Sequence, residues 1–399
     1  MPGVLKRAST KVSASLLYNN LSCNGKSVAY VHHSEVILVP DNAVTSGANA
    51  TAVRIMDRDQ AVIKQARFVE AGGAEYLVIG STRSLQVYSP DGKRMLHSQN
   101  ILDAGTADAP AFFRGLAGCT AGGEDYLVAG TSTGDVCLVA CTGGAFGMPL
   151  QLREQTAPIV DLAAAFSPES ADEAFVASAD EAGLLVVLAL GGGGASRVHA
   201  SFGGDPAALC TAVRIRRNLL LSGYCTGHVR VHDLTSRSLM VQRRGQGGLL
   251  GRGISGPHGL LRLRSKARGC STHSEGGAWR LRPPQEAMAI QPHTPPKLTI
   301  SPRLPILPIQ VQIAAHARWV NALEVHPSRD VMATAAEDCT VSVWRLPSGD
   351  GSSQLKHAGA LVVQDAMLCG VGFCGGGGGR DHVATVAYDV ELIHSFSID

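Results

Sequence analysis

The chain has 399 residues, of which 45% are hydrophobic and 17% are charged, and its formal net charge is +2. A chain of this length and apolar content can bury a large core, and none of its apolar runs approaches the roughly 18 residues of a membrane-spanning helix. The 46 glycines and the many short Val-rich runs bounded by Gly, Asp, Ser or Thr indicate strands instead of long amphipathic helices. We therefore expect a soluble all-β protein.

The N-terminal segment carries Lys6, Arg7 and Lys11 without an acidic residue, which faintly resembles a mitochondrial presequence. Residues 11–17, KVSASLL, alternate between polar and apolar types, and this alternation predicts a strand instead. The ten cysteines are scattered through predicted strands, and no secretory apolar segment precedes them. We therefore expect a reducing, cytoplasmic compartment.

One hairpin pattern recurs along the chain: an apolar strand, a small or polar turn and a second apolar strand. Most successive turns lie about 45 to 51 residues apart, whereas about 112 residues separate the turns near Thr226 and Asp338. A regular spacing of this size is typical of proteins in which each repeat forms one sheet of a propeller. The seven hairpins begin at Ser27, Glu75, Asp125, Ala174, Asn218, Val331 and Asp381.

The stretch HARWVNALEVHPSRDVMATAAEDCTVSVW begins at His316 and carries four polar or aromatic side chains in a recognisable order. After His316 come Thr334 in an apolar strand, Asp338 in a tight turn and Trp344 at the end of the next strand. The stretch resembles one complete repeat of the WD-repeat β-propeller family. This resemblance implies a structural hydrogen-bond tetrad that links the Asp carboxylate, the His ring, the Thr hydroxyl and the Trp indole N–H. Loss of one buried partner in such a network costs about 1–3 kcal/mol.

Further stretches resemble one branch of these proteins, the WD repeat-containing protein 54 family. They include AGTSTGDVCLV from Ala129, SGYCTGHVRV from Ser222 and YDVELIHSFS from Tyr388. The resemblance covers most of the chain outside residues 243–308 and implies a cytoplasmic adaptor without catalytic residues. Only the sixth hairpin has the full tetrad. In the others, Tyr88, Val139, Leu188 and His232 fill the Trp position, and Arg83, Thr133 and Thr226 replace the turn Asp.

Residues 243–308 differ in composition from the rest of the chain. They contain nine of the 19 prolines and 11 basic residues against two acidic ones, which leaves 24 basic and 31 acidic residues elsewhere, a formal charge of about −7. The segment has no strand–turn–strand pair, so it predicts an insertion and not a blade. Its low complexity predicts a disordered loop, and a gene-model artefact such as a translated intron is the alternative. The strings SLMVQ at 238–242 and IQVQI at 309–313 are two candidates for one outer strand of blade five.

These observations predict a single seven-bladed WD40-type propeller with a disordered insertion. Residues 1–242 are expected to form blades one to five, 243–308 the insertion, and 309–399 blades six and seven. The chain ends after the third strand of blade seven, so we expect the N-terminal segment 11–17 to supply the fourth strand and remove an open edge. The innermost strands are expected in segments that begin at Val62, Phe112, Ile159, Ala208, Val320 and Leu368.

The predicted inner strands offer few groups for catalysis at a channel mouth. Asp161, Glu324 and Asp365 are the main acidic candidates, and they do not recur from blade to blade. The spacing of Cys225, His228 and His232 resembles a metal site, but four strand residues span about 13 Å, too far for both histidines to bind one ion.

We therefore predict no catalytic residue, cofactor or metal, and favour a non-catalytic scaffold for protein or peptide partners. One alternative is a propeller enzyme with its site at the channel mouth. The other is binding of nucleic acid or an acidic surface through the basic insertion, which the acidic propeller disfavours for nucleic acid.

Overall fold

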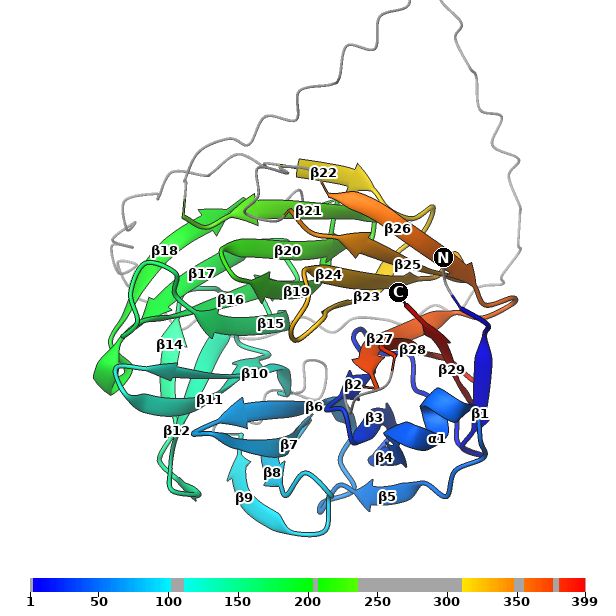
Figure 1. Ribbon diagram of the computed structural model, residues 1–399. Helices are drawn as coiled ribbons and strands as arrows, with labels where there is room; N and C mark the ends of the chain where they lie inside the picture. The colour runs from blue at the N-terminus through cyan, green and yellow to red at the C-terminus, as the bar shows by residue number, and fades with distance from the viewer. Residues whose placement is uncertain are drawn as a thin grey trace, which may run out of the picture. The chain divides into compact units, whose positions relative to one another are not determined.

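The computed structural model shows seven antiparallel sheets arranged around a common axis (Figure 1). The described sheets belong to one compact unit that comprises Met1–Gln242 and Leu304–Asp399. The predicted all-β, seven-bladed propeller is therefore confirmed, whereas the prediction of disorder for 243–308 concerns residues outside the described part of the chain. The structure describes residues 3–101, 111–203, 207–235, 311–347, 355–375 and 380–398.

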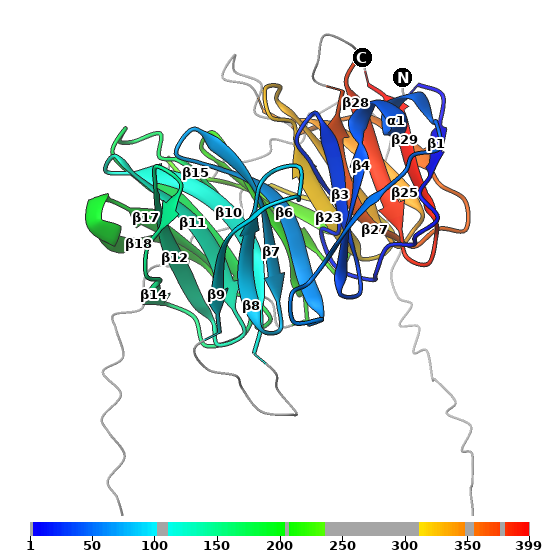
Figure 2. The ribbon, with the colours of Figure 1, turned by 90° about the horizontal axis from the view of Figure 1, so that it is seen from below.

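Each blade is a meander whose strands run outward from the axis, and Figure 2 shows the strands crossing the thickness of the propeller. Innermost strands of adjacent blades contact one another around the ring, which closes between blade 7 and blade 1. Blade 1 consists of β2 (Ser22–Cys23), β3 (Ser27–His32), β4 (Glu35–Pro40) and β5 (Val53–Met56). Blade 2 consists of β6 (Ile63–Ala71), β7 (Ala74–Ser81), β8 (Ser84–Tyr88) and β9 (Met95–Asn100). Blade 3 consists of β10 (Phe113–Ala121), β11 (Glu124–Thr131), β12 (Asp135–Thr142), β13 (Ala145–Phe146) and β14 (Leu150–Arg153).

Middle strands are buried on both sides because each blade packs against two neighbours. All six residues of β17, LVVLAL, are buried, whereas most residues of the outer strand β26, KHAGALV, are exposed. Blade 4 consists of β15 (Ile159–Phe166), β16 (Ala174–Asp180), β17 (Leu185–Leu190) and β18 (Ser196–Phe202), with the short 3₁₀ helix η1 (Gly192–Gly194) before β18. Blade 5 consists of β19 (Cys210–Arg216), β20 (Leu219–Tyr224), β21 (His228–Asp233) and β22 (Val311–Ala314). Blade 6 consists of β23 (Val320–Val325), β24 (Val331–Ala336), β25 (Thr340–Arg345) and β26 (Lys356–Val362).

Blade 7 combines β27 (Leu368–Cys374), β28 (His382–Ala387) and β29 (Leu392–Ser397) with the N-terminal strand β1 (Lys6–Ser9). Closure of the last blade by an N-terminal strand is confirmed, but the segment predicted for it was wrong. Residues 11–17 form no strand, and Ala14 makes only an isolated bridge to Tyr388. The reason is local: Lys11 has φ +59°, so the chain turns after β1 and then runs towards blade 1.

Blade 5 takes its outer strand, β22, from a part of the sequence far from its other three strands. Of the two candidate strings, the second contributes β22, whose Val229 to Ile313 register joins it to β21. The first string, 238–242, lies outside the described residues.

A short helix, α1 (Asp41–Ser46), lies between β4 and β5 and was not predicted. It packs beside β1 and β29 (Figure 2), with Val44 fully buried and Ser395 Oγ donating to the Val44 carbonyl at 2.8 Å. The helix ends at Gly47, which has φ +77° and donates its N–H to the carbonyls of Ala43 and Val44. Among the described helices, none has the length and apolar character required to cross a bilayer.

Candidate functional site

The structure brings His316, Thr334, Asp338 and Trp344 together in blade 6. His316 Nδ1 lies 3.1 Å from Asp338 Oδ1, and its Nε2 lies 2.8 Å from Thr334 Oγ1. The indole of Trp344 donates to the same hydroxyl at 3.2 Å. Burial lowers the pKa of His316 more than Asp338 raises it, so the ring is neutral near pH 7, and donation from Nδ1 to Asp338 leaves Nε2 to accept from Thr334.

Other blades fill the same ladder positions with different polar groups. In blade 4, Ile159 pairs with Asp180 as Val320 pairs with Ala336 in blade 6. This register places Gln155 at the position of the blade 6 histidine, and Ser178 Oγ donates to its amide oxygen.

In blade 2, Tyr88 takes the ladder position of Trp344, because it pairs with Leu77 as Trp344 pairs with Met332. The Tyr88 hydroxyl donates to the Gln86 amide oxygen at 3.0 Å, and Gln86 donates to Asp57 at 2.8 Å. The polar network of a WD blade is thus replaced here by another set of bonded side chains.

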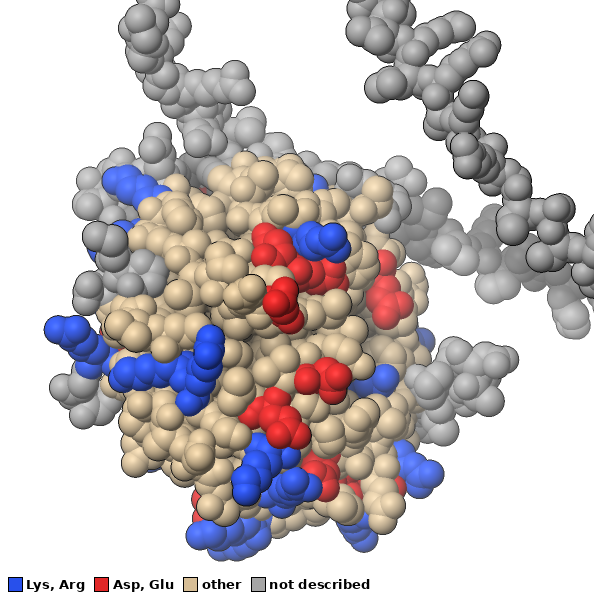
Figure 3. All heavy atoms as spheres, turned by 90° about the vertical axis from the view of Figure 1, so that its right-hand side faces the viewer, with Lys and Arg blue, Asp and Glu red and all other residues tan. Residues whose placement is uncertain are grey.

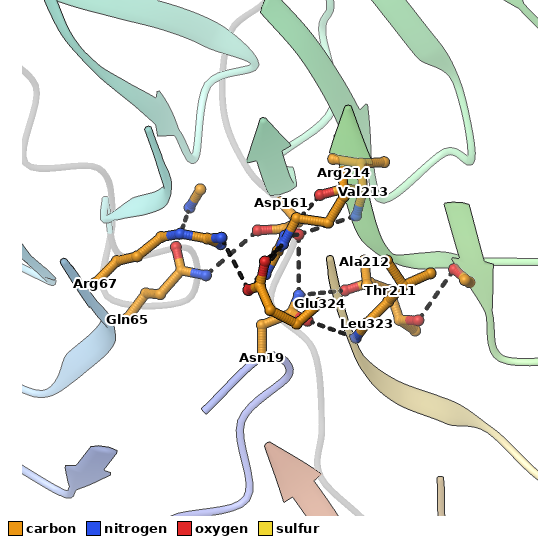
Figure 4. A network of polar contacts seen from close by, with 12 residues as sticks. Asn19, Gln65, Arg67, Asp161, Thr211, Ala212, Val213, Arg214, Leu323 and Glu324 are labelled. Atoms are coloured by element: carbon orange, nitrogen blue, oxygen red, sulfur yellow. Dashed lines mark hydrogen bonds and ion pairs between the residues drawn. The ribbon is translucent and has the colours of Figure 1, made fainter. Parts of the chain in front are cut away.

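The propeller axis is occupied by a second set of polar side chains, which we call the central network (Figure 4). Arg67, Arg214 and Glu324 occupy equivalent ladder positions of β6, β19 and β23. Gln65 and Asp161 lie two ladder positions earlier on β6 and β15. The position of Arg67 holds only small residues in blades 3, 4 and 7, namely Ala117, Ala163 and Gly372.

Arg214 links two carboxylates across the channel. Its Nη1 lies 2.8 Å from Asp161 Oδ2, and its Nε lies 3.1 Å from Glu324 Oε1. Arg67 Nη2 donates to Glu324 Oε2 at 2.9 Å. The side chains of Arg214 and Asp161 are only 4% and 0% exposed, so these ion pairs are shielded from water.

The electrostatics of the central network favour its ionised form. Burial raises the pKa of Glu324, but Arg214 and Arg67 outweigh this effect, so its pKa is lowered overall. Burial lowers the pKa of Arg214, but Glu324 and Asp161 outweigh it, so its pKa is raised. The pKa of Arg67, unlike that of Arg214, is lowered, since burial and then the charge of Arg214 both disfavour its protonated form.

The N-terminal segment enters the channel at Asn19. Its amide nitrogen donates to Asp161 Oδ2 at 2.9 Å, and its amide oxygen accepts from the Leu323 N–H at 3.1 Å. Asn19 has φ +52°, a conformation that Asn tolerates better than most residues. One side chain from the start of the chain therefore connects blades 4 and 6.

Sequence reasoning identified Asp161 and Glu324 as channel residues but missed the arginines that bind them. The available signal was a charged residue inside a strand of small and apolar residues, as at Arg214 in CTAVRIR. Asp365, the third acidic candidate, is exposed in the turn before β27 with φ +54° and takes no part in this network.

One face of the propeller, at which the innermost strands begin, carries a ring of apolar side chains. We call it the entry face. In blades 2 to 7 the residue just before the inner strand accepts a backbone hydrogen bond from the hairpin turn of its own blade, which fixes six equivalent positions. Of these, Val62, Trp319 and Met367 are 52%, 41% and 40% exposed. The six residues are Val62, Phe112, Pro158, Leu209, Trp319 and Met367.

A cavity of about 270 Å³ opens on the entry face between blades 7, 1 and 2. Its lining includes Leu16, Val62 and Tyr388, which are 52%, 52% and 47% exposed. The Tyr388 N–H also donates to the Met367 carbonyl, so the cavity adjoins the ring of apolar residues. A recess with exposed apolar side chains among polar ones such as Ser15 and His33 suits the side chains of a protein partner.

Cys225, His228 and His232, whose spacing resembles a metal site, do not form one group of contacts. His228 Nδ1 contacts the hydroxyl of Thr226 at 3.1 Å, whereas the buried His232 ring packs on Phe202 with 4.1 Å between centroids. Among the described residues, no group of three or more His, Cys, Asp or Glu side chains could hold a metal ion.

Comparisons with known proteins agree with this architecture. The WDR54 family model matches residues 10–249 and 306–398. WD repeat domain 54 of Rattus norvegicus is 24% identical over 326 residues, which cover 80% of this chain and 74% of the relative. WD repeat-containing protein 54 of Homo sapiens is 24% identical over 327 residues with the same shares.

A chain in the crystal structure of the mitotic checkpoint complex has the same kind of fold. It superposes with a TM-score of 0.59 at 12% identity, covering 100% of this chain and 94% of the other. At that identity the likeness concerns the fold alone. The resemblance first seen in the hairpin sequences is confirmed by the family match, which spans most of the sequence on both sides of residues 250–305. The chain therefore belongs to the WDR54 family of WD-repeat proteins.

Proposed function

We propose that this protein is a non-catalytic scaffold that binds protein or peptide partners on its entry face. The observation that carries the proposal is the ring of six apolar residues at equivalent positions, three of which are at least 40% exposed. Large apolar and aromatic side chains around a recess are typical anchors of protein interfaces. Family membership supports an interaction scaffold in general.

An enzyme would need reactive groups that can reach a substrate. The two carboxylates of the channel, Asp161 and Glu324, are both engaged by Arg214, and Asn19 also bonds to Asp161. This arrangement suits stabilisation of the ring better than proton transfer. We therefore favour a binding role over catalysis.

Binding of nucleic acid has less support in the described residues. On the side of the propeller that carries β1, acidic and basic side chains are both present among broad uncharged areas (Figure 3). Such a surface lacks the single-sign field that attracts a phosphate backbone. The basic stretch that motivated this alternative lies outside the described residues.

We further propose that the protein works in the reducing cytoplasm. The nine cysteines in the described ranges are all free thiols, and six of them are buried in the blades. Free buried thiols of this kind are usual in proteins that function in a reducing compartment.

A site-specific crosslinking experiment tests the proposed face. A photoreactive amino acid replaces Trp319 or Met367 on the entry face, and Phe166, which is 68% exposed at the far end of β15, serves as the matched control. We expect defined protein adducts in cells from positions 319 and 367, and their loss when the neighbouring ring residue is changed to Asp. Adducts that form only from position 166 would contradict the proposal.

A further inference from the structure

Two cations stand at the channel mouth without a bonded counter-charge. Lys64 and Arg114 are each the second residue after an apolar ring residue, Val62 and Phe112, on the inner strands of blades 2 and 3. Both side chains are half-buried. Among the described residues, neither makes a salt bridge, whereas Arg67 and Arg214 deeper in the channel both do.

Each of the two cations lies over an aromatic ring. Lys64 Nζ lies 5.6 Å from the centroid of the Phe112 ring, and Arg114 Cζ lies 5.1 Å from that of Tyr18. The Nε of Arg114 is buried without a hydrogen-bond partner in the described residues. A buried donor left unpaired is costly, and it indicates a place where an acceptor from outside can bind.

The two cations also repel each other. Burial lowers the pKa of Lys64 first, and the charge of Arg114 lowers it further. Asp161 raises the pKa of Arg114 but is not bonded to it, since Asp161 accepts from Arg214, Asn19, Gln65 and the Val213 N–H. An added negative charge here would relieve this repulsion.

We propose that Lys64 and Arg114 bind the carboxylate of an Asp or Glu side chain from the partner that docks on the entry face. The inference rests on the proposed function, and it adds the chemistry of the partner: an acidic residue flanked by apolar ones. The acidic group enters the mouth, and its apolar neighbours lie on the ring formed around Val62, Trp319 and Met367.

A carboxylate fits this site better than a phosphate dianion. Burial lowers the pKa of Arg114, whereas Asp161, Tyr18 and Glu181 each raise it, so negative groups already lie near this cation and a monoanion suits the site better than a dianion. A single carboxylate can accept from one Arg and one Lys donor, whereas a phosphate offers three oxygens and would need more donors.

Selection of displayed peptides on the purified full-length protein tests the proposal. The probe is a library of random 12-residue peptides, screened on the unchanged chain and on the double variant Lys64→Gln/Arg114→Gln. We expect the unchanged chain to enrich peptides with Asp or Glu next to apolar residues. The double variant should bind the same peptides about tenfold more weakly and lose the acidic preference.

Matched variants separate the possible outcomes. Arg83→Gln removes a cation from the exposed β7–β8 turn of the same face and should leave the preference unchanged. Lys64→Gln alone replaces the double variant if the Arg114 change prevents folding. Lys64→Arg, which keeps the positive charge, should bind the peptides as the unchanged chain does. A selected peptide remade with phosphoserine in place of its acidic residue should bind no more tightly, and tighter binding would overturn the choice of a carboxylate.

The selected peptides distinguish the carboxylate site from the entry face as a whole. The carboxylate site would be overturned if the peptides compete with one another and no longer bind the Met367→Asp variant, yet show no preference for Asp or Glu. That result would leave the proposed scaffold function intact. Peptides insensitive to Met367→Asp and Trp319→Asp would contradict the entry face itself.

Discussion

The guanidinium of Arg214 lies 2.8 Å from the carboxylate of Asp161, in an ion pair that joins blades 4 and 5 at the axis of the propeller. Both groups are almost fully shielded from water, and Glu324 holds the other side of the same guanidinium. Charges at this depth are tolerated only when they are paired and hydrogen-bonded. The centre of the ring is therefore stabilised by polar contacts, unlike the apolar layers between the blades.

Replacing Arg214 by Met should lower the free energy of unfolding by about 3–5 kcal/mol, because the buried Asp161 carboxylate loses its bonded cation and Glu324 loses one of its two. The midpoint of urea denaturation measures this effect. Lys93→Met is the control: the side chains of Lys93 and its partner Asp91 are 79% and 55% exposed, so loss of this pair should change the midpoint little. Equal effects of the two substitutions would contradict the stabilising role of the central network.

Asp338→Ala should lower the stability of the protein by about 1–3 kcal/mol, since the His316 ring and the Ala317 N–H lose a buried or half-buried acceptor. Thermal unfolding followed by circular dichroism is the measurement. The neighbouring Glu337→Ala provides the control in the same turn, and a variant at 338 that melts like the one at 337 would contradict the tetrad's structural role.

The buried His232 should make the protein sensitive to acid. Burial lowers its pKa to about 4, with a further contribution from Arg230, whereas the unfolded value is near 6.5. Since the unfolded state binds the proton more readily in this window, stability is complete above pH 6.5 and falls towards pH 4 by about 3 kcal/mol from this group.

His232→Phe tests this expectation, because a phenyl ring can keep the contact with Phe202. Between pH 7.5 and pH 5, the melting temperature of the variant should fall less than that of the parent. His394, whose pKa burial also lowers to about 4, remains as a source of residual acid sensitivity. An unchanged pH dependence would show that His232 does not titrate as described.

Deletion of residues 1–9 should open the edge of β29, which pairs with β1 through Lys6 to Ser9. Exposed edge strands favour association with other chains, so we expect a lower melting temperature and concentration-dependent oligomers. Light scattering at increasing concentration measures this. Arg7→Ser, which keeps the strand, should remain monodisperse to the same degree as the parent.

Deletion of residues 243–308 should leave a folded propeller, because β21 and β22 remain joined by a short linker and keep their pairing. The measurement is the melting temperature together with the β-sheet circular dichroism spectrum. Loss of cooperative unfolding would show that the segment contributes to the fold.

The repeat count and the inner strands of blades 2 to 7 could be predicted because each depends on a local pattern of apolar runs and turns, whereas the two-residue inner strand β2 of blade 1 carries no such pattern. The position of β1 could not, since KRAS at 6–9 has little apolar character and is selected by the free edge of β29. Likewise, Asn19 gives no local sign that it will bond to Asp161, 142 positions away. Long-range polar contacts of this kind are set by the closed ring and leave no periodic trace in the sequence.

The bonds made by β1 and Asn19 have a consequence for the order in which the protein matures on the ribosome. These residues leave the exit tunnel well before their partners in β23 and β29 have been synthesised. The nascent chain must therefore hold its N-terminal segment unpaired while six blades are being made. Ring closure therefore follows the synthesis of β29, and chaperones that shield the waiting strand would act before that step.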